Sequence, residues 1–133
     1  MQFRTQIPIS KINHPIGYDS KVVSLGSCFA VNMAEKFDYF QFMNAVNPFG
    51  ILFHPLAIEK LLGWAENRTQ FTAADVFLRN ERWHSFDVHS DLSDANQQNL
   101  LQKVNDAIEA THLSISQASH IIITYGTAWV YRE

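Results

Sequence analysis

The sequence has few charged side chains, a single cysteine and no long apolar run. Because Cys28 has no partner, an internal disulfide and a small fold held by disulfides are excluded. Charged residues make up 17% of the chain, below the globular norm of about 25%, which excludes a charge-rich disordered chain. No stretch approaches the roughly 18 apolar residues of a membrane span, and the first residues lack the apolar segment of a signal peptide. We therefore expect a soluble, cytoplasmic protein that does not enter a membrane.

The charges that are present are mixed rather than clustered. Ten basic and thirteen acidic residues give a formal charge of −3. No basic patch exists of the kind that neutralises the phosphates of nucleic acids. The sequence also lacks a glycine-rich dinucleotide fingerprint and a phosphate-binding loop with its lysine. We expect neither a nucleic-acid partner nor a cofactor.

The apolar residues, 47% of a chain of 133, are enough for the core of one domain. Two continuous, β-branched runs, 21–25 and 120–124, predict strands covered on both faces, as in parallel sheets. Residues 42–46 are a weaker candidate for a third strand. Residues 1–20 contain turn-forming prolines and a glycine, and we expect them to form an extended arm.

Apolar residues at helical spacing predict helices at about 29–40, 55–67 and 94–117, the last capped by Ser93 or Asp94. A short hairpin is expected within residues 76–86. The order of elements predicts an α/β fold with about three parallel strands, in which Val22–Leu25 and Ile121–Thr124 are neighbours.

The sequence stops soon after the last predicted strand, which limits the number of strands in the sheet. The sequence stops seven residues after Gly126, where the turn after a parallel strand normally leads into a helix. A sheet of three strands is narrow, and its last strand is left as a long apolar edge. We expect residues 1–133 to be one domain that forms the N-terminal portion of a longer domain, or a domain whose edge is covered by a second copy or a partner chain.

Ligands of parallel α/β sheets bind where the strands end. The turns expected there are 26–30, 47–50 and 125–129. Ser27 and Cys28 lie where a strand becomes a helix, and the N–H groups of a helix N-terminus stabilise a thiolate or an oxyanion. Either residue is a candidate nucleophile. The alternative is structural, with Ser27 as the helix cap and Cys28 as a small buried side chain.

His84, Asp87 and His89 form a polar cluster that invites a metal-site interpretation. On a strand, however, positions 84 and 89 point to opposite faces, and no second group with ligand spacing exists. We therefore expect no metal site. His84 and His54 stay as candidates that line the substrate site, and Trp129 as a wall of its pocket.

Four separated segments resemble, in order, the motifs of the GSCFA family. They are 26–30, which spells the family's name, then 47–53, 83–87 and 126–131. The resemblance extends over nearly the whole chain, from Phe3 to the end, and indicates the N-terminal part of such a protein. The first segment is similar to the Gly-Asp-Ser block of SGNH/GDSL esterases, which implies a truncated flavodoxin-like sheet and an esterase or acyl-hydrolase activity.

This second similarity implies roles for single residues. Gly26 falls on the glycine of the esterase block, Ser27 on its aspartate and Cys28 on its nucleophilic serine. Gly50 resembles the glycine whose N–H helps to bind the oxyanion, and Gly126 that of the Gly-x-Asn-Asp block. Ala128 stands at the asparagine position of that block, so one oxyanion donor is missing, and the hydroxyl of Thr127 offers a replacement. The complete set of expected oxyanion and substrate-binding residues is Gly50, Gly126, Thr127, Asn47, His84 and Trp129.

The Asp-x-x-His block that supplies the general base does not occur in these 133 residues. A nucleophile without its base is only weakly activated. The resemblance therefore implies a hydrolase of small esters or acylated molecules whose chain 1–133 alone has little activity. Two alternatives stay open: a non-catalytic module that pairs with another chain, and a domain that binds a small ligand or nucleotide.

Overall fold

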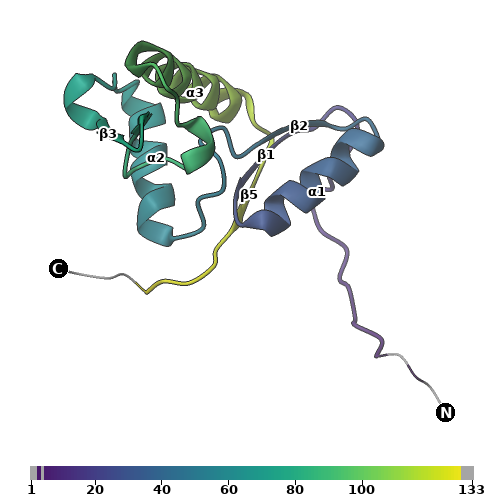
Figure 1. Ribbon diagram of the computed structural model, residues 1–133. Helices are drawn as coiled ribbons and strands as arrows, with labels where there is room; N and C mark the ends of the chain where they lie inside the picture. Colours follow the sequence, from purple (N-terminus) through teal and green to yellow (C-terminus); the bar gives the residue numbers. More distant parts are fainter. Residues whose placement is uncertain (1–2, 4, 130–133) are drawn as a thin grey trace.

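A computed structural model describes residue 3 and residues 5–129. Its centre is a parallel sheet of three strands in the order β2-β1-β5, formed by Met43–Val46, Lys21–Gly26 and His120–Thr124. Helix α1 (Cys28–Tyr39) covers one face, while α2 (Pro55–Asn67) and α3 (Gln97–Gln117) lie on the other (Figure 1). The predicted α/β fold with three parallel strands is confirmed, as is the pairing of β1 with β5.

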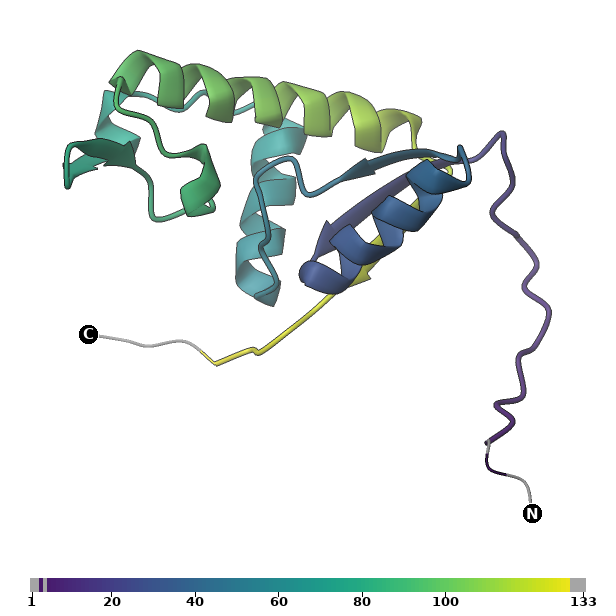
Figure 2. The ribbon, with the colours of Figure 1, turned by 45° about the vertical axis from the view of Figure 1, so that its right-hand side comes forward.

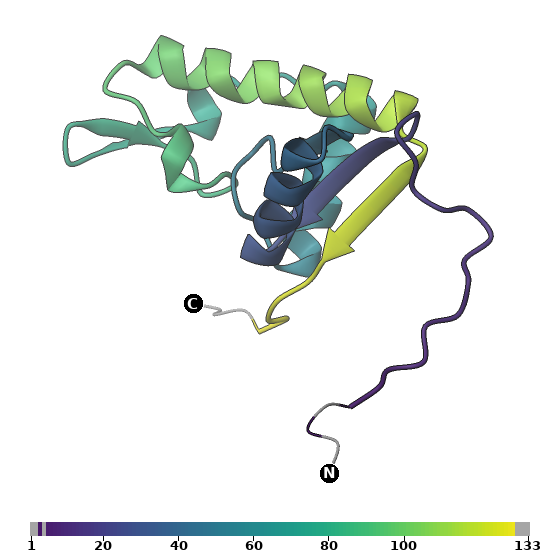
Figure 3. The ribbon, with the colours of Figure 1, turned by 90° about the vertical axis from the view of Figure 1, so that its right-hand side faces the viewer.

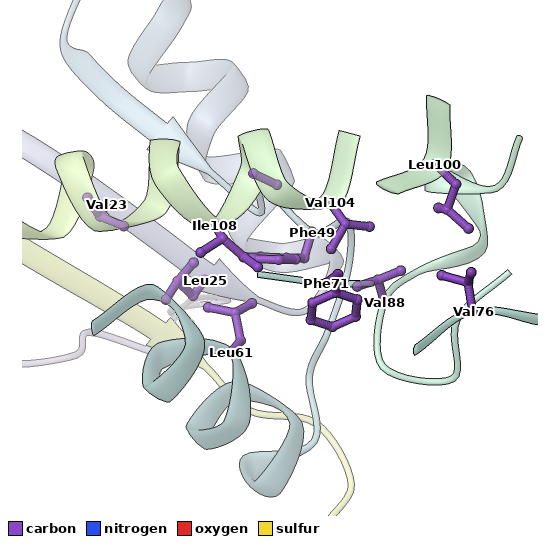
Figure 4. Packing of buried hydrophobic residues seen from close by; sticks show 11 residues of the cluster. Val23, Leu25, Phe49, Leu61, Phe71, Val76, Val88, Leu100, Val104 and Ile108 are labelled. Atoms are coloured by element: carbon purple, nitrogen blue, oxygen red, sulfur yellow. The ribbon is translucent and has the colours of Figure 1, made fainter. Parts of the chain in front are cut away.

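Strand β1 is central, and every residue from Val22 to Gly26 is buried. Successive side chains of a strand point to opposite faces, so a continuous apolar strand needs cover on both. Val23 and Leu25 belong to the main core, where Leu61 of α2 and Ile108 of α3 meet them (Figure 4). The two layers of helices therefore account for the burial of β1 on both faces, including that of Ser24 between its apolar residues.

The segment after α2 forms a small unit beside the outer end of α3 (Figure 2). It contains the 3₁₀ turns Ala73–Asp75 and Ser90–Leu92 and a hairpin of β3 (Phe77–Arg79) with β4 (Arg82–His84). The hairpin confirms the prediction for this segment. Trp83 exchanges two backbone hydrogen bonds with Asp94, at 2.7 and 3.2 Å, which attach the hairpin to the segment just before α3.

The start of α3 differs from the prediction. The helix begins at Gln97, and its cap is Asn96, whose side chain accepts hydrogen bonds from the N–H groups of Gln98 and Asn99. Asp94 does not cap it because the backbone of Asp94 pairs with Trp83 and is held in an extended conformation. A contact between distant residues thus decides where this helix starts.

The burial predicted for β5 is also wrong. The strand lies at the edge of the sheet, and Ile121 is 49% exposed. Residues of the arm before β1 have no helix or strand and are mostly exposed, as predicted, and they run past the open side of β5 (Figure 3). In the described residues the sheet has three strands, and β5, on its outer side, is only partly covered by the helices.

The carboxylate of Asp94 provides a test of how the hairpin unit is held. Lys103 donates a hydrogen bond to it at 2.7 Å, and together with the N–H of Asn96 lowers the pKa of Asp94 from 3.8 to about 2. Because the folded pKa is lower than the unfolded one, the carboxylate stabilises the fold above about pH 4, and this contribution is lost as the pH falls from about 4 through 2.

We expect Lys103→Met to raise the pKa of Asp94 and to lower the free energy of unfolding at pH 7. The difference in stability between the two proteins should shrink as the pH falls through 2, because the carboxylate of the parent protein becomes protonated there. NMR titration of the Asp94 carboxyl and urea unfolding at both pH values measure this. Lys60→Met, which removes the exposed ion pair with Asp87, is the control that leaves Asp94 unchanged. A titration of Asp94 that does not move would contradict this account.

Candidate functional site

The turn from β1 into α1 is shaped by Gly26. This residue has a φ of +126°, a conformation that side chains disfavour. A Cβ added there would lie only 2.0 Å from the carbonyl oxygen of Thr124 at the end of β5. Only glycine lets the ends of β1 and β5 approach so closely. The next residue, Ser27, is the N-terminal cap of α1.

Hydrogen bonds join the ends of all three strands at this turn. The side chain of Asn47, just after β2, accepts from the N–H of Gly26 at 2.8 Å and donates to its carbonyl at 3.2 Å. On the other side, the N–H of Ser27 donates to the hydroxyl and carbonyl oxygens of Thr124, at 2.9 and 3.0 Å. The predicted gathering of these turns at one edge of the sheet is therefore present in the structure.

The two candidate nucleophiles have different surroundings. The Ser27 hydroxyl accepts a hydrogen bond from the N–H of Phe29 at 3.3 Å and shares another with the Thr124 hydroxyl at 3.0 Å. It therefore caps α1, as the structural alternative predicted. Cys28 is the first residue of α1 and is exposed, so the structural alternative of a small buried side chain does not apply to it. In the described part of the chain, no hydrogen bond to its thiol is present.

The glycines expected to bind an oxyanion use their N–H groups within the protein. The N–H of Gly50 donates to the carbonyl of Asn47 at 2.8 Å, and that of Gly126 donates to the carbonyl of Phe53 at 2.9 Å. Either N–H would have to leave its carbonyl partner to bind an oxyanion. Both positions have a steric reason for glycine, because an added Cβ would lie 2.4 Å from His89 Cβ or 2.7 Å from the Phe53 ring.

The remaining predicted site residues lie in β4 and in the segment after β5. His84 lies in β4, where its ring stacks on that of Phe77 at 5.8 Å, in the hairpin unit away from the strand ends (Figure 1). Thr127 and Trp129 are exposed, and the Thr127 hydroxyl accepts the N–H of Trp129 at 3.2 Å. Trp129 is 89% exposed and does not wall a pocket. A hollow of about 790 Å³ runs along α2 to Tyr125, and Cys28 does not line it.

Two residues that were not predicted to contact these turns do so in the structure. Thr124 supplies both the hydroxyl and the carbonyl oxygen that accept the N–H of Ser27. Its position as the polar residue that ends an apolar strand is the sequence feature that could have indicated this contact. His89 packs on Gly50, and its backbone N–H donates to the carbonyl of Phe49 at 3.2 Å. No local pattern connects residues 50 and 89, so only the fold reveals this contact.

His54 is a further polar group near these turns. Its Nδ1 accepts the N–H of Leu56 at 3.2 Å and so caps α2, while its Nε2 is buried without a hydrogen-bond partner. Within the described ranges, no three His, Cys, Asp or Glu side chains gather closely enough to hold a metal ion. In the same part of the chain, no helix combines the length and apolar character that crossing a membrane requires.

Comparison with known proteins identifies the family. The model of the GSCFA family matches residues 21–133, which is most of the chain. The chain belongs to the GSCFA family. No curated protein and no solved structure matches it.

The five residues of the GSCFA motif each have a place in this turn. Gly26 allows the close approach to β5, Ser27 caps α1, and Ala30 is completely buried where α1 meets the sheet. Cys28 and Phe29 are exposed on the first turn of α1, with Phe29 at 58%. The GSCFA motif therefore combines residues that build the turn with two that face solvent.

We expect Gly26→Ala to destabilise the protein by at least about 2 kcal/mol, because the methyl group meets the Thr124 carbonyl and the positive φ is strained. The control is Gly63→Ala, in the interior of α2, where nothing lies within 4 Å of the added Cβ. This change should stabilise the protein by about 0.5–1 kcal/mol through helix propensity. Urea unfolding measures both, and an unaltered stability of Gly26→Ala would refute the close contact.

Proposed function

We propose that this GSCFA domain acts as an acyl-hydrolase-like domain on small esters or acylated molecules, with Cys28 as its nucleophile. The observation that supports this most directly is the exposed thiol on the first turn of α1, at the edge where the parallel strands end. Ligands of parallel α/β sheets bind at this edge. The similarity of residues 26–28 to the esterase block supports the same residue.

Cys28 is a better candidate than Ser27 for two reasons. The Ser27 hydroxyl already has two partners, the N–H of Phe29 and the hydroxyl of Thr124, and removing it from them would weaken the cap of α1. The Cys28 thiol faces solvent and has no such structural duty. A thiol is also the stronger intrinsic nucleophile of the two near neutral pH.

The reaction follows from the chemistry of a thiolate. The sulfur of Cys28 attacks the acyl carbon, the ester C–O bond breaks, and the alcohol leaves with a proton. The product is a thioester on Cys28, which water then cleaves to release the carboxylic acid and restore the thiol. The positive end of the α1 dipole favours the negative charge that develops on the acyl oxygen. The N–H of Cys28 is the donor that we assign to this oxygen.

Two features limit this chain as a catalyst. The N–H groups of Gly50 and Gly126 are engaged by Asn47 and Phe53, so stabilisation of the oxyanion rests on the start of α1. In addition, the described part of the chain shows no hydrogen bond between the Cys28 thiol and a base. A base of this kind typically contributes 10²–10⁴-fold in rate. We also propose a cytoplasmic location, because an exposed nucleophilic thiol stays reduced there.

The first test measures acylation. With p-nitrophenyl acetate near pH 7, we expect the folded chain to gain one acetyl group at Cys28, at least about tenfold faster than the same chain unfolded in urea. Cys28 is the only cysteine, so Cys28→Ala should abolish labelling. Ser27→Ala should still be labelled, although the lost cap costs about 1 kcal/mol of stability. Mass spectrometry measures each rate. Equal rates in the folded and unfolded chains would favour the non-catalytic module.

The second test measures turnover. We expect the acetyl group to stay on Cys28 after the first reaction, because within the described ranges no base is hydrogen-bonded at Cys28 to activate the water that must release it. Added imidazole should accelerate its loss from the folded protein more than from an acetylated small-molecule thiol. Steady-state hydrolysis well above that of Cys28→Ala, without added imidazole, would mean that the chain has its own base.

A further inference from the structure

The outer edge of β5 has backbone groups that the sheet does not use. The carbonyl of Thr124 accepts the N–H of Ser27, so Thr124 directs its backbone groups toward β1. Neighbouring residues of a strand direct theirs to opposite sides. The N–H and carbonyl groups of Ile121 and Ile123 therefore point away from β1, to the edge where no strand pairs in the described part of the chain. Strand β5 contains no proline, aspartate, glutamate or lysine, the residues that keep an exposed edge from pairing with another strand.

The arm before β1 has a complementary pattern. Ile7 and Ile9 are 77% and 90% exposed and alternate with the polar or imino residues around them. The base of the arm is attached at the start of β5, because Nε2 of His120 donates to the carbonyl of His14 at 3.0 Å. From there the arm extends along the open side of β5 and away from the sheet (Figure 3). Its chain direction is opposite to that of β5.

We propose that this arm closes onto β5 of the same chain as a fourth, antiparallel strand, with Ile9 opposite Ile121 and Ile7 opposite Ile123. An antiparallel strand at the edge of a parallel sheet is common in α/β proteins. In this register the backbone groups of Ile7 and Ile9 face those of Ile121 and Ile123. Pro8 then directs its nitrogen to the solvent side of an edge strand, a position at which a sheet tolerates proline.

The same register places the side chains correctly. Ile121 and Ile123 pair with Val23 and Leu25 of β1, so their side chains lie on the face that α2 and α3 cover. Residues directly opposite in an antiparallel pair share a face. Ile9 and Ile7 therefore extend this core outward, and Ile9 covers the half-exposed Ile121. Shifting the arm by one residue would instead turn Pro8 toward β5 and both isoleucines to the α1 side.

The connection is long enough for the arm of the same chain. Residues 10–20 must cross from the new strand to β1, a distance of two strand spacings, or about 10 Å. Eleven residues reach more than about 30 Å when extended. Because His14 already lies at the start of β5, closure needs only a rotation of the segment before it.

Hydrogen exchange of the β5 amides tests the proposal. In the full chain we expect the N–H groups of Ile121 and Ile123 to exchange at least about tenfold more slowly than in Ile9→Pro, which removes an N–H that faces β5. Ser10→Pro is the matched control, because its N–H faces solvent in this register, and it should keep the protection. The amide of Ile122, which faces β1, should be equally protected in all three proteins and reports that the sheet is intact.

Two results would overturn the proposal. Equal exchange of Ile121 and Ile123 in the full chain and in Ile9→Pro would show that the edge stays open. Protection that increases with protein concentration, together with a dimer in light scattering, would show that a second copy covers the edge. Neither result depends on Cys28, so acylation by p-nitrophenyl acetate can succeed or fail independently.

Discussion

The close approach of β1 to the end of β5 is the contact on which the rest of the site depends. At Gly26 the backbone lies so near the Thr124 carbonyl that no side chain fits. The side chain of Asn47, which follows β2, binds the N–H and the carbonyl of Gly26 from the other side. The ends of three strands are thereby joined by directional hydrogen bonds rather than by packing alone. The position of Ser27, and with it the start of α1, follows from this arrangement.

The exposure of Cys28 is a consequence of how the helix begins. A cap residue must direct its hydroxyl back to the first turn, so Ser27 faces the strands and the next side chain, that of Cys28, faces outward. Free cysteines are among the most buried residues in proteins, and an exposed one adds little to packing. In a motif where Gly26, Ser27 and Ala30 have structural duties, Cys28 is the residue whose side chain is available for chemistry.

The backbone donors at this edge are used to hold the turns. Gly50 and Gly126 resemble oxyanion-binding glycines, yet their N–H groups bind Asn47 and Phe53 and so maintain the turns after β2 and β5. A donor that is already satisfied must break one hydrogen bond to make another, which removes most of the benefit. Of these turns, the start of α1 is therefore the one where the helix dipole would act on a negative charge beside Cys28, as the proposed function requires.

The sequence by itself determined the elements and their class. The continuous apolar runs of β1 and β5 and the helical spacing of α1 and α2 predicted strands and helices nearly to the residue, because these patterns reflect local geometry. The GSCFA motif likewise predicted the strand-to-helix turn. Tertiary structure decided the rest: α3 starts at Gln97 because Asp94 pairs with Trp83, β5 is only partly buried, Cys28 is exposed, and the N–H of Gly50 donates to the carbonyl of Asn47. Burial and hydrogen-bond partners depend on residues far apart in the chain, and local periodicity has no information about them.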